Sequence, residues 1–174
     1  LMPTDLVVHS GATLRLLPNA VLEMGKDRSI FIEPGGKVVL DHARVTNSCD
    51  NDWGRIVVKR GAKLVVDGGN IRSDNARWGG IEVWGNTSVV HGDLFGSVEP
   101  SGLTAADYVG VMTTASDPGV VVISNGSLIE RGNVNTITTT RAGGYFPDHY
   151  GGLVYVENSV FDDCRKGVSL MRYE

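Results

Sequence analysis

Acidic residues gather before two of the three tryptophans, in a pattern that could bind a metal ion. Asp50 and Asp52 precede Trp53, and Asp74 precedes Trp78. If equivalent turns of the chain stack on one another, these carboxylates come close together, and clustered oxygen ligands are what Ca²⁺ requires. The alternative is that the aspartates accommodate tight bends through local side-chain to backbone hydrogen bonds. We expect no cofactor other than, under the first interpretation, calcium.

A second set of residues, Trp84, Tyr145, Phe146 and His149, has the chemistry of a ligand-binding surface. Trp84 follows an alternating segment, and the alternation is expected to point it outward beside an inserted loop. The other three residues end a polar, threonine-rich segment, and long loops on a rigid scaffold commonly carry function. The alternative is an insertion with no binding role.

The elements that would position these residues are repeats of roughly 25 residues. Segment 30–41, IFIEPGGKVVLD, matches segment 56–67, IVVKRGAKLVVD, at an offset of 26 residues (56 − 30). Later copies open with an aromatic residue, one or two small residues and an aliphatic one; these starts are Trp53, Trp78, Tyr108 and Tyr150. The shared position of Trp53 and Trp78 favours packing at a corner of the core over sugar stacking.

Each copy divides into three short strands separated by turns, which predicts a triangular coil. Alternation of apolar and polar residues indicates which side chains face inward. The expected first column is Ile30, Ile32, Ile56, Val58, Ile81 and Val83. The second is Leu14, Leu16, Val38, Leu40, Leu64 and Val66, and the third is Val21, Val45, Ile71, Ile129 and Val160. Stacking is required because no single coil can bury its apolar face alone.

The pattern therefore predicts an all-β parallel β-helix, a solenoid of about six coils of three short strands. Residues 1–174 are expected to form a single domain, a fragment of a longer protein, with inserted loops near 85–106 and 131–149.

The tryptophan-glycine-isoleucine coil start, the GxxLxVxG pattern and the closing segment 158–168, NSVFDDCRKGV, resemble the right-handed parallel β-helix domains of the pectin-lyase-like superfamily. The coils look most similar to those of large secreted surface proteins of Bacteroidetes-type bacteria, many of which are type IX secretion cargo. The resemblance implies a right-handed solenoid and an extracellular location, either secreted or at the cell surface. It specifies the fold and not the function, because the superfamily includes lyases, hydrolases, adhesins and stalks.

Catalysis has weaker support than binding. A polysaccharide lyase of this kind needs a basic side chain beside a bound uronate, and Arg55, Arg72 and Arg77 are the basic residues near the acidic corner. None of them lies in a recognisable motif. Glycoside hydrolysis needs two carboxylates roughly 5 to 10 Å apart, and stacked coils bring many acids that close by accident. The sequence assigns no catalytic residue and leans against an enzyme.

Charge and hydropathy narrow the set of partners. The net charge is −4, and acidic and basic residues are mixed along the chain. The sequence has no basic stripe of the kind that binds a phosphate backbone, so no nucleic-acid partner is expected. No apolar run is long enough for a membrane span.

The leading hypothesis is a non-catalytic β-helical segment of a secreted or cell-surface protein that presents loops for adhesion or carbohydrate contact. Its partner would be a polysaccharide or a host or cell-surface glycan. The alternative is a fragment of a polysaccharide-degrading enzyme, a lyase or a glycoside hydrolase. A third hypothesis is end-to-end association of copies through their open coils, because truncated coils expose strand edges.

Overall fold

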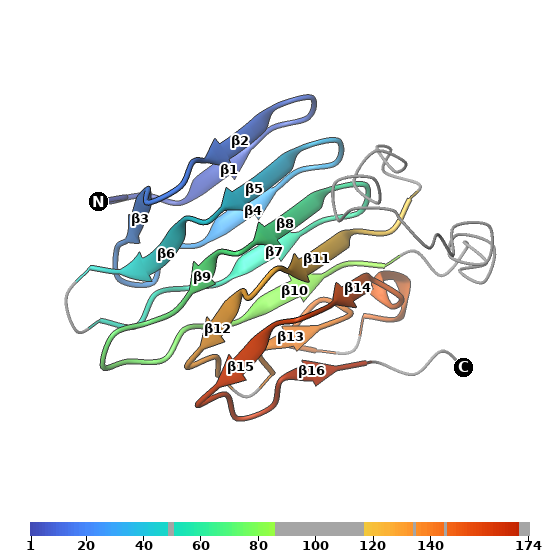
Figure 1. The fold of residues 1–174 in the computed structure, drawn as a ribbon. Coiled ribbons are helices and arrows are strands. Elements are labelled where there is room, and N and C mark those ends of the chain that lie inside the picture. The colour runs from blue at the N-terminus through green and yellow to red at the C-terminus, as the bar shows by residue number, and fades with distance from the viewer. Residues whose placement is uncertain (49–50, 86–116, 134, 145, 171–174) are drawn as a thin grey trace.

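The chain winds into a right-handed parallel β-helix, as predicted (Figure 1). The computed structural model describes residues 1–48, 51–85, 117–133, 135–144 and 146–170. Its strands form three parallel sheets of six, five and five strands, in which each strand pairs with the equivalent strand one coil away. The described residues thus contain five complete coils and one further strand.

The three sheets run along the three sides of the coil. The first sheet consists of β1 (Leu6–Val8), β4 (Ile30–Ile32), β7 (Ile56–Val58), β10 (Ile81–Val83), β13 (Ile137–Thr138) and β16 (Val168–Ser169). The second consists of β2 (Thr13–Leu16), β5 (Lys37–Asp41), β8 (Lys63–Asp67), β11 (Val120–Ser124) and β14 (Leu153–Val156). The third consists of β3 (Val21–Met24), β6 (Arg44–Asn47), β9 (Asn70–Ile71), β12 (Leu128–Glu130) and β15 (Val160–Asp162).

Helical structure is confined to one short 3₁₀ turn, η1 (Pro147–His149), within the described part of the chain. Across those same residues, no helix has the length and apolar character needed to cross a membrane.

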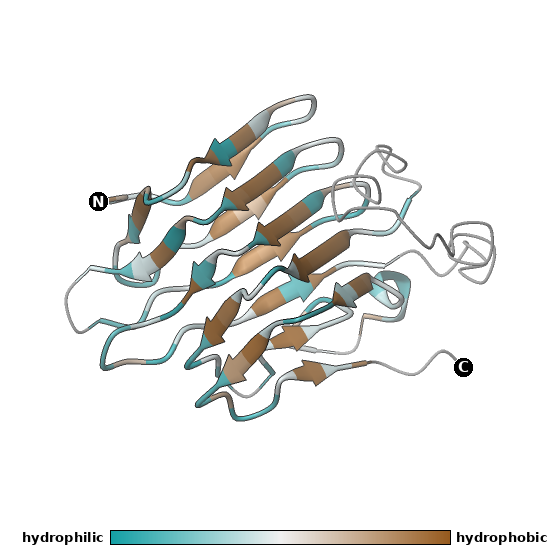
Figure 2. Ribbon diagram, viewed as in Figure 1, coloured by the Kyte–Doolittle hydropathy of each residue, from teal (hydrophilic) through white to brown (hydrophobic). Residues whose placement is uncertain are grey.

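The inward columns predicted for the first and second sheets are confirmed. Ile30, Ile56 and Ile81 pair directly across β4, β7 and β10, and each is 1% exposed. Val38 and Leu64 pair in the same way across β5 and β8. The middle of the third column is confirmed by Val45, Ile71 and Ile129. Each buried aliphatic side chain contributes about 1.5 to 3 kcal/mol, and Figure 2 shows the resulting apolar strands separated by polar turns.

The two ends of the third column were predicted one residue out of register. Leu22 pairs with Val45, and Phe161 pairs with Ile129, so these residues face the core. Val21 and Val160 point outward and are 46% and 57% exposed. A shift of one residue moves a side chain to the other face of a sheet. The sequence could not reveal the shift because both members of each pair, Val21-Leu22 and Val160-Phe161, are apolar.

The tryptophans that open two coils fill a corner of the core, as predicted. Trp53 and Trp78 are 2% and 0% exposed, and their rings stack at 4.7 Å with an angle of 2° between planes. The glycine after each tryptophan is needed because the neighbouring coil is close. A Cβ atom on Gly54 would lie 2.8 Å from the carbonyl oxygen of Arg28, and one on Gly79 would lie 2.7 Å from that of Gly54.

The later coils differ from the sequence prediction in two respects. Segment 131–149 is not entirely a loop, since β13 lies within it and pairs with β10 and β16. Its threonines, in β13 and on either side of it, are buried, with Thr136 at 0% exposure. Tyr150 leads into β14 of the second sheet and does not start a coil in the first. Tyr108 and most of the predicted loop at 85–106 lie outside the described residues.

The corrected register of the third sheet predicts that one substitution has a large effect at Phe161 and a small effect at the adjacent Val160. We expect Phe161→Asp to lower the free energy of unfolding by about 2 kcal/mol or more, because it replaces a partly buried aromatic that packs against the core by a charge. Val160→Asp should change it by less than about 0.5 kcal/mol, since this side chain is exposed. Urea denaturation followed by circular dichroism measures both. Equal losses would contradict the register.

Lys63, at the start of β8, makes stability depend on pH. Burial, reinforced by the charge of Lys37 on the neighbouring strand, lowers the pKa of Lys63 from 10.5 to about 8. Between those two values the unfolded chain binds more protons than the folded one, so stability rises with pH across this window. We expect Lys63→Met to remove much of the rise in urea midpoint between pH 8 and pH 10. Lys26→Met, at an exposed site, is the control and should retain the rise.

Candidate functional site

Trp84, directly after β10, is the centre of a cluster of aromatic and cationic side chains. The alternation that buries Ile81 and Val83 directs Trp84 outward, as predicted, and its ring is half-buried. The position is rigid because β10 is an internal strand that pairs with β7 on one side and β13 on the other.

Hydrogen bonds to main-chain carbonyl oxygens hold η1 against the end of β10. The Gly85 N–H donates to the carbonyl oxygen of His149 at 2.7 Å. Arg60, from the turn after β7, donates through Nε to the carbonyl oxygen of Gly85 at 2.9 Å and through Nη2 to that of Asp148. One arginine therefore joins two segments that are distant in the sequence, and it places η1 beside Trp84.

The rings and cations of this cluster meet at short distances. His149 lies edge-on to Trp84, with ring centroids 4.7 Å apart and an angle of 82°. The Phe146 ring is 6.0 Å from that of His149. The Arg141 guanidinium lies 4.4 Å from the Phe146 centroid and 5.6 Å from the Trp84 centroid, and Lys59 Nζ is 5.8 Å from the latter. We call Trp84, Phe146, His149, Lys59 and Arg141 the aromatic platform.

A buried carboxylate orients the indole. Glu82 points outward from β10, yet its side chain is only 6% exposed. It accepts a hydrogen bond from Trp84 Nε1 at 3.1 Å and forms an ion pair with Arg55. Lys59 is held in turn by Glu33, with Nζ 2.7 Å from Oε1. The platform is thus positioned by a carboxylate on the same coil and another on the neighbouring coil, and it needs little rearrangement to bind a ligand.

The platform keeps His149 neutral at physiological pH. Burial lowers the pKa of His149, and the nearby charges of Arg60 and Arg141 lower it further. Its Nδ1 atom is buried and has no hydrogen-bond partner among the described residues. The imidazole therefore contributes a ring edge and no charge, while the positive charge comes from Lys59, Arg60 and Arg141.

Three of the four predicted binding residues are brought together here. Trp84, Phe146 and His149 converge, whereas Tyr145 lies outside the described residues. Sequence reasoning missed the cations Lys59, Arg60 and Arg141 completely. Only the coil register could have identified Lys59 and Arg60, because they follow β7 just as Trp84 follows β10.

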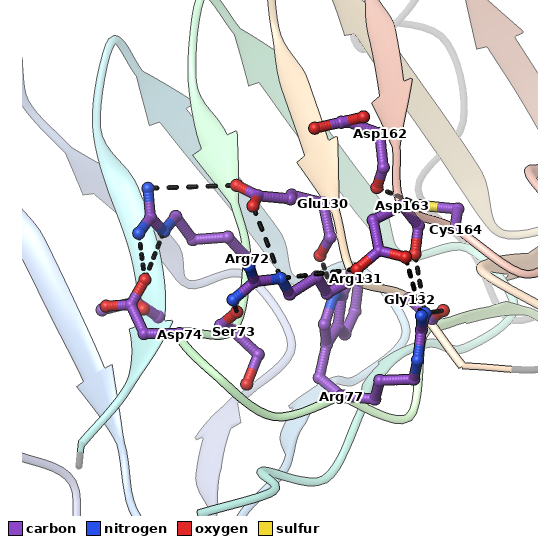
Figure 3. A network of polar contacts seen from close by, with 12 residues as sticks. Arg72, Ser73, Asp74, Arg77, Glu130, Arg131, Gly132, Asp162, Asp163 and Cys164 are labelled. Atoms are coloured by element: carbon purple, nitrogen blue, oxygen red, sulfur yellow. Dashed lines mark hydrogen bonds and ion pairs between the residues drawn. The ribbon is translucent and has the colours of Figure 1, made fainter. Parts of the chain in front are cut away.

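A chain of ion pairs occupies the corner at the opposite end of β10, where the third sheet ends (Figure 3). Arg72, after β9, donates from Nε to Asp74 Oδ1 at 2.8 Å. Its Nη1 also lies 3.9 Å from Glu130 Oε2, at the end of β12. Register explains the second contact, because Ile71 pairs with Ile129 and the residues after them are adjacent.

The chain of ion pairs continues to the next coil. Glu130 lies 3.6 Å from Arg131 Nε, and the same nitrogen lies 3.5 Å from Asp163 Oδ2. The other oxygen of Asp163 is 2.7 Å from Arg77 Nη2. Charged side chains of alternating sign therefore connect segments that follow β9, β12 and β15 (Figure 3).

An open depression of about 690 Å³ lies beside this ion-pair chain. Its wall is polar and includes three arginines. The lining residues are Asp52, Asn75, Ala76, Arg77, Arg131, Asn133, Asp163 and Arg165. We call it the arginine basin. Sequence reasoning named Arg77 and Asp52 in this region but missed Arg131, Asp163 and Arg165, which come from later coils.

The predicted calcium ligands have other partners in the structure. Asp74 is bound by Arg72, and Asp52 Oδ1 accepts a hydrogen bond from the Arg77 N–H at 2.9 Å. Asp50 lies outside the described residues. Within the described ranges, no group of three or more His, Cys, Asp or Glu side chains is arranged to hold a metal ion. Calcium binding at Asp50, Asp52 and Asp74 remains a prediction.

Comparison with known proteins adds no assignment: a scan against family models, a search of curated proteins and a search of solved structures each returned no match.

The lowered pKa of His149 predicts how stability changes with pH. Because the folded-state pKa lies below the ordinary value of 6.5, the unfolded chain binds more protons as the pH falls through that value. The stability present above pH 6.5 is therefore progressively lost below it. We expect His149→Gln to show a smaller drop in melting temperature than the unmodified protein between pH 7 and pH 5. His9→Gln, an exposed site, should show the unmodified drop.

Proposed function

We propose that this chain is a non-catalytic β-helical segment of a secreted or cell-surface protein and that it presents the aromatic platform for contact with a carbohydrate. The observation that carries this proposal is the convergence of Trp84, Phe146 and His149 with two cations on one rigid coil edge. Membership of the pectin-lyase-like superfamily and secretion as type IX cargo are part of the same proposal, on the resemblance of the coil motifs.

The chemistry of the platform suits a sugar. The apolar C–H face of a pyranose packs on an aromatic ring, and a half-buried indole provides such a face with little loss of side-chain freedom. Trp84 is already oriented by Glu82 and His149, so binding would not need to order it. Lys59, Arg60 and Arg141 supply positive charge around the ring and favour a glycan that bears acidic groups.

The enzymatic alternative receives less support from the candidate bases. Arg55 pairs with Glu82, Arg72 with Asp74, and Arg77 with Asp163. A base must be able to give up its proton, and a neighbouring carboxylate favours the charged form. Accordingly, the hydrogen bond from Asp74 raises the pKa of Arg72. None of these three arginines therefore has the environment of a general base.

Glycan binding and catalysis are separated by one set of measurements. We expect at least one acidic polysaccharide from a panel of pectins, alginate and glycosaminoglycans to bind, without formation of shorter or unsaturated products. Trp84→Ala should weaken binding about tenfold or more, as expected for an anchoring aromatic. Isothermal titration calorimetry and product chromatography, with and without calcium, provide the two readouts.

Tyr155→Ala serves as the matched control, because Tyr155 is a half-buried aromatic on β14 that donates its hydroxyl to Glu157 and packs against the apolar cluster containing Val65 and Val122. It should retain the unmodified affinity. Product formation would establish the enzymatic alternative, and equal weakening by both substitutions would contradict the platform. Circular dichroism is the measurement that checks whether each variant is folded.

A further inference from the structure

We infer that the arginine basin is a binding site for an oxyanion, such as a sulfate, phosphate or carboxylate group. This site is additional to the aromatic platform. Arg77 and the basin precede β10, whereas Trp84 follows it, so the two sites lie at opposite ends of that strand.

The charge of the lining favours an anion. Three arginines and two aspartates face the depression, which leaves one net positive charge on a chain whose total is −4. Both oxygens of Asp163 already face arginine nitrogens, and Asp52 Oδ1 accepts the Arg77 N–H. The carboxylates therefore hold the arginines in position, and the lining as a whole keeps one net positive charge.

The first arginine is fixed in place and still has donors available. Arg77 Nη1 donates to the carbonyl oxygens of Asp163 at 2.6 Å and Gly132 at 3.2 Å, and Nη2 donates to Asp163 Oδ1 at 2.7 Å. A guanidinium carries five N–H groups. Nε–H and one N–H of Nη2 therefore have no partner among the described residues. A guanidinium held rigidly with donors to spare loses little entropy when it binds an oxyanion.

The other two arginines complete the site from different coils. Arg131 donates from Nη1 to the carbonyl oxygen of Ser73 at 3.3 Å and is held through Nε by Glu130 and Asp163. Arg165 is exposed, and its side chain has no ion-pair or hydrogen-bond partner in the described ranges. A cationic side chain beside a polar depression, without a carboxylate of its own, is available to close over a bound anion.

The volume indicates that the anion is part of a larger molecule. A depression of about 690 Å³ is far larger than one sulfate and lies in the range of small-ligand sites. The exposed Asn133 offers a neutral amide next to the arginines for hydroxyl groups of the same ligand. Each of these candidate ligands carries an oxyanion on a larger polar molecule. The experiment below identifies which oxyanion binds.

Anion titrations of the ¹⁵N-labelled protein test this inference. Sodium sulfate, sodium phosphate, glucuronate and a sulfated disaccharide are added at constant ionic strength, because salt screens weak electrostatic binding. We expect saturable shifts of the Arg77, Asn133 and Arg165 amide signals with at least one of these probes. Tighter binding of the disaccharide than of free sulfate would identify a sulfated carrier, and tighter binding of glucuronate would identify a carboxylated one.

Arg165→Ala and Lys166→Ala form a matched pair, since both are exposed, adjacent and remove one positive charge. Arg165→Ala should weaken binding about tenfold, the loss expected for one charge-assisted hydrogen bond. Lys166→Ala should change the affinity less than twofold. The proposed oxyanion site would be overturned if the two variants weakened binding equally. It would also be overturned if the signal shifts did not saturate or came from residues outside the basin. The result is independent of Trp84→Ala, which should leave oxyanion affinity unchanged.

Discussion

Main-chain hydrogen bonding between coils in strict register is the constraint on which the rest of this structure depends. Each strand donates to and accepts from the equivalent strand one coil away, which spaces coils about 4.8 Å apart and places equivalent residues in columns. An aliphatic residue in a column is buried by its neighbours above and below, so most of those neighbours are also apolar. The repeat in the sequence is therefore a direct consequence of the hydrogen-bond register.

The same constraint governs the corners. Two tryptophans at equivalent positions must lie about one coil apart, which is close to the 4.7 Å stacking distance of Trp53 and Trp78. Like charges at equivalent positions repel one another. At the corner after the third sheet, Arg72 lies beside Glu130 and Arg131 lies beside Asp163, so these stacked pairs carry opposite charges. Such a chain of pairs links three coils, whereas an isolated surface pair contributes little.

Both proposed binding surfaces lie where the strands of the first sheet begin or end. The core side of each strand is filled by its aliphatic column, so variation is tolerated mainly at turns and outward positions. The aromatic platform combines the turn after β7, the end of β10 and the segment around η1. The arginine basin combines the turns after β6, β9, β12 and β15. Each surface is assembled from at least three parts of the chain, and a rigid solenoid keeps the parts at fixed separations.

Sequence alone determined the solenoid and most of its core, because periodic apolar residues and glycines at tight approaches are local signals of a repeated strand. It also identified Trp84, Phe146 and His149 from their chemistry. It failed where neighbouring residues were equally apolar, as at Val160 and Phe161, and where the threonine-rich segment 136–140 contained a strand, β13, in place of a loop. The coil register implies that Lys59 lies beside Trp84, because Val58 pairs with Val83. Only the tertiary structure decided the other partners: Arg141 at Trp84, and Arg131 and Arg165 beside Arg77. Those contacts depend on how many residues each turn inserts, and the periodicity of the strands carries no information about that length.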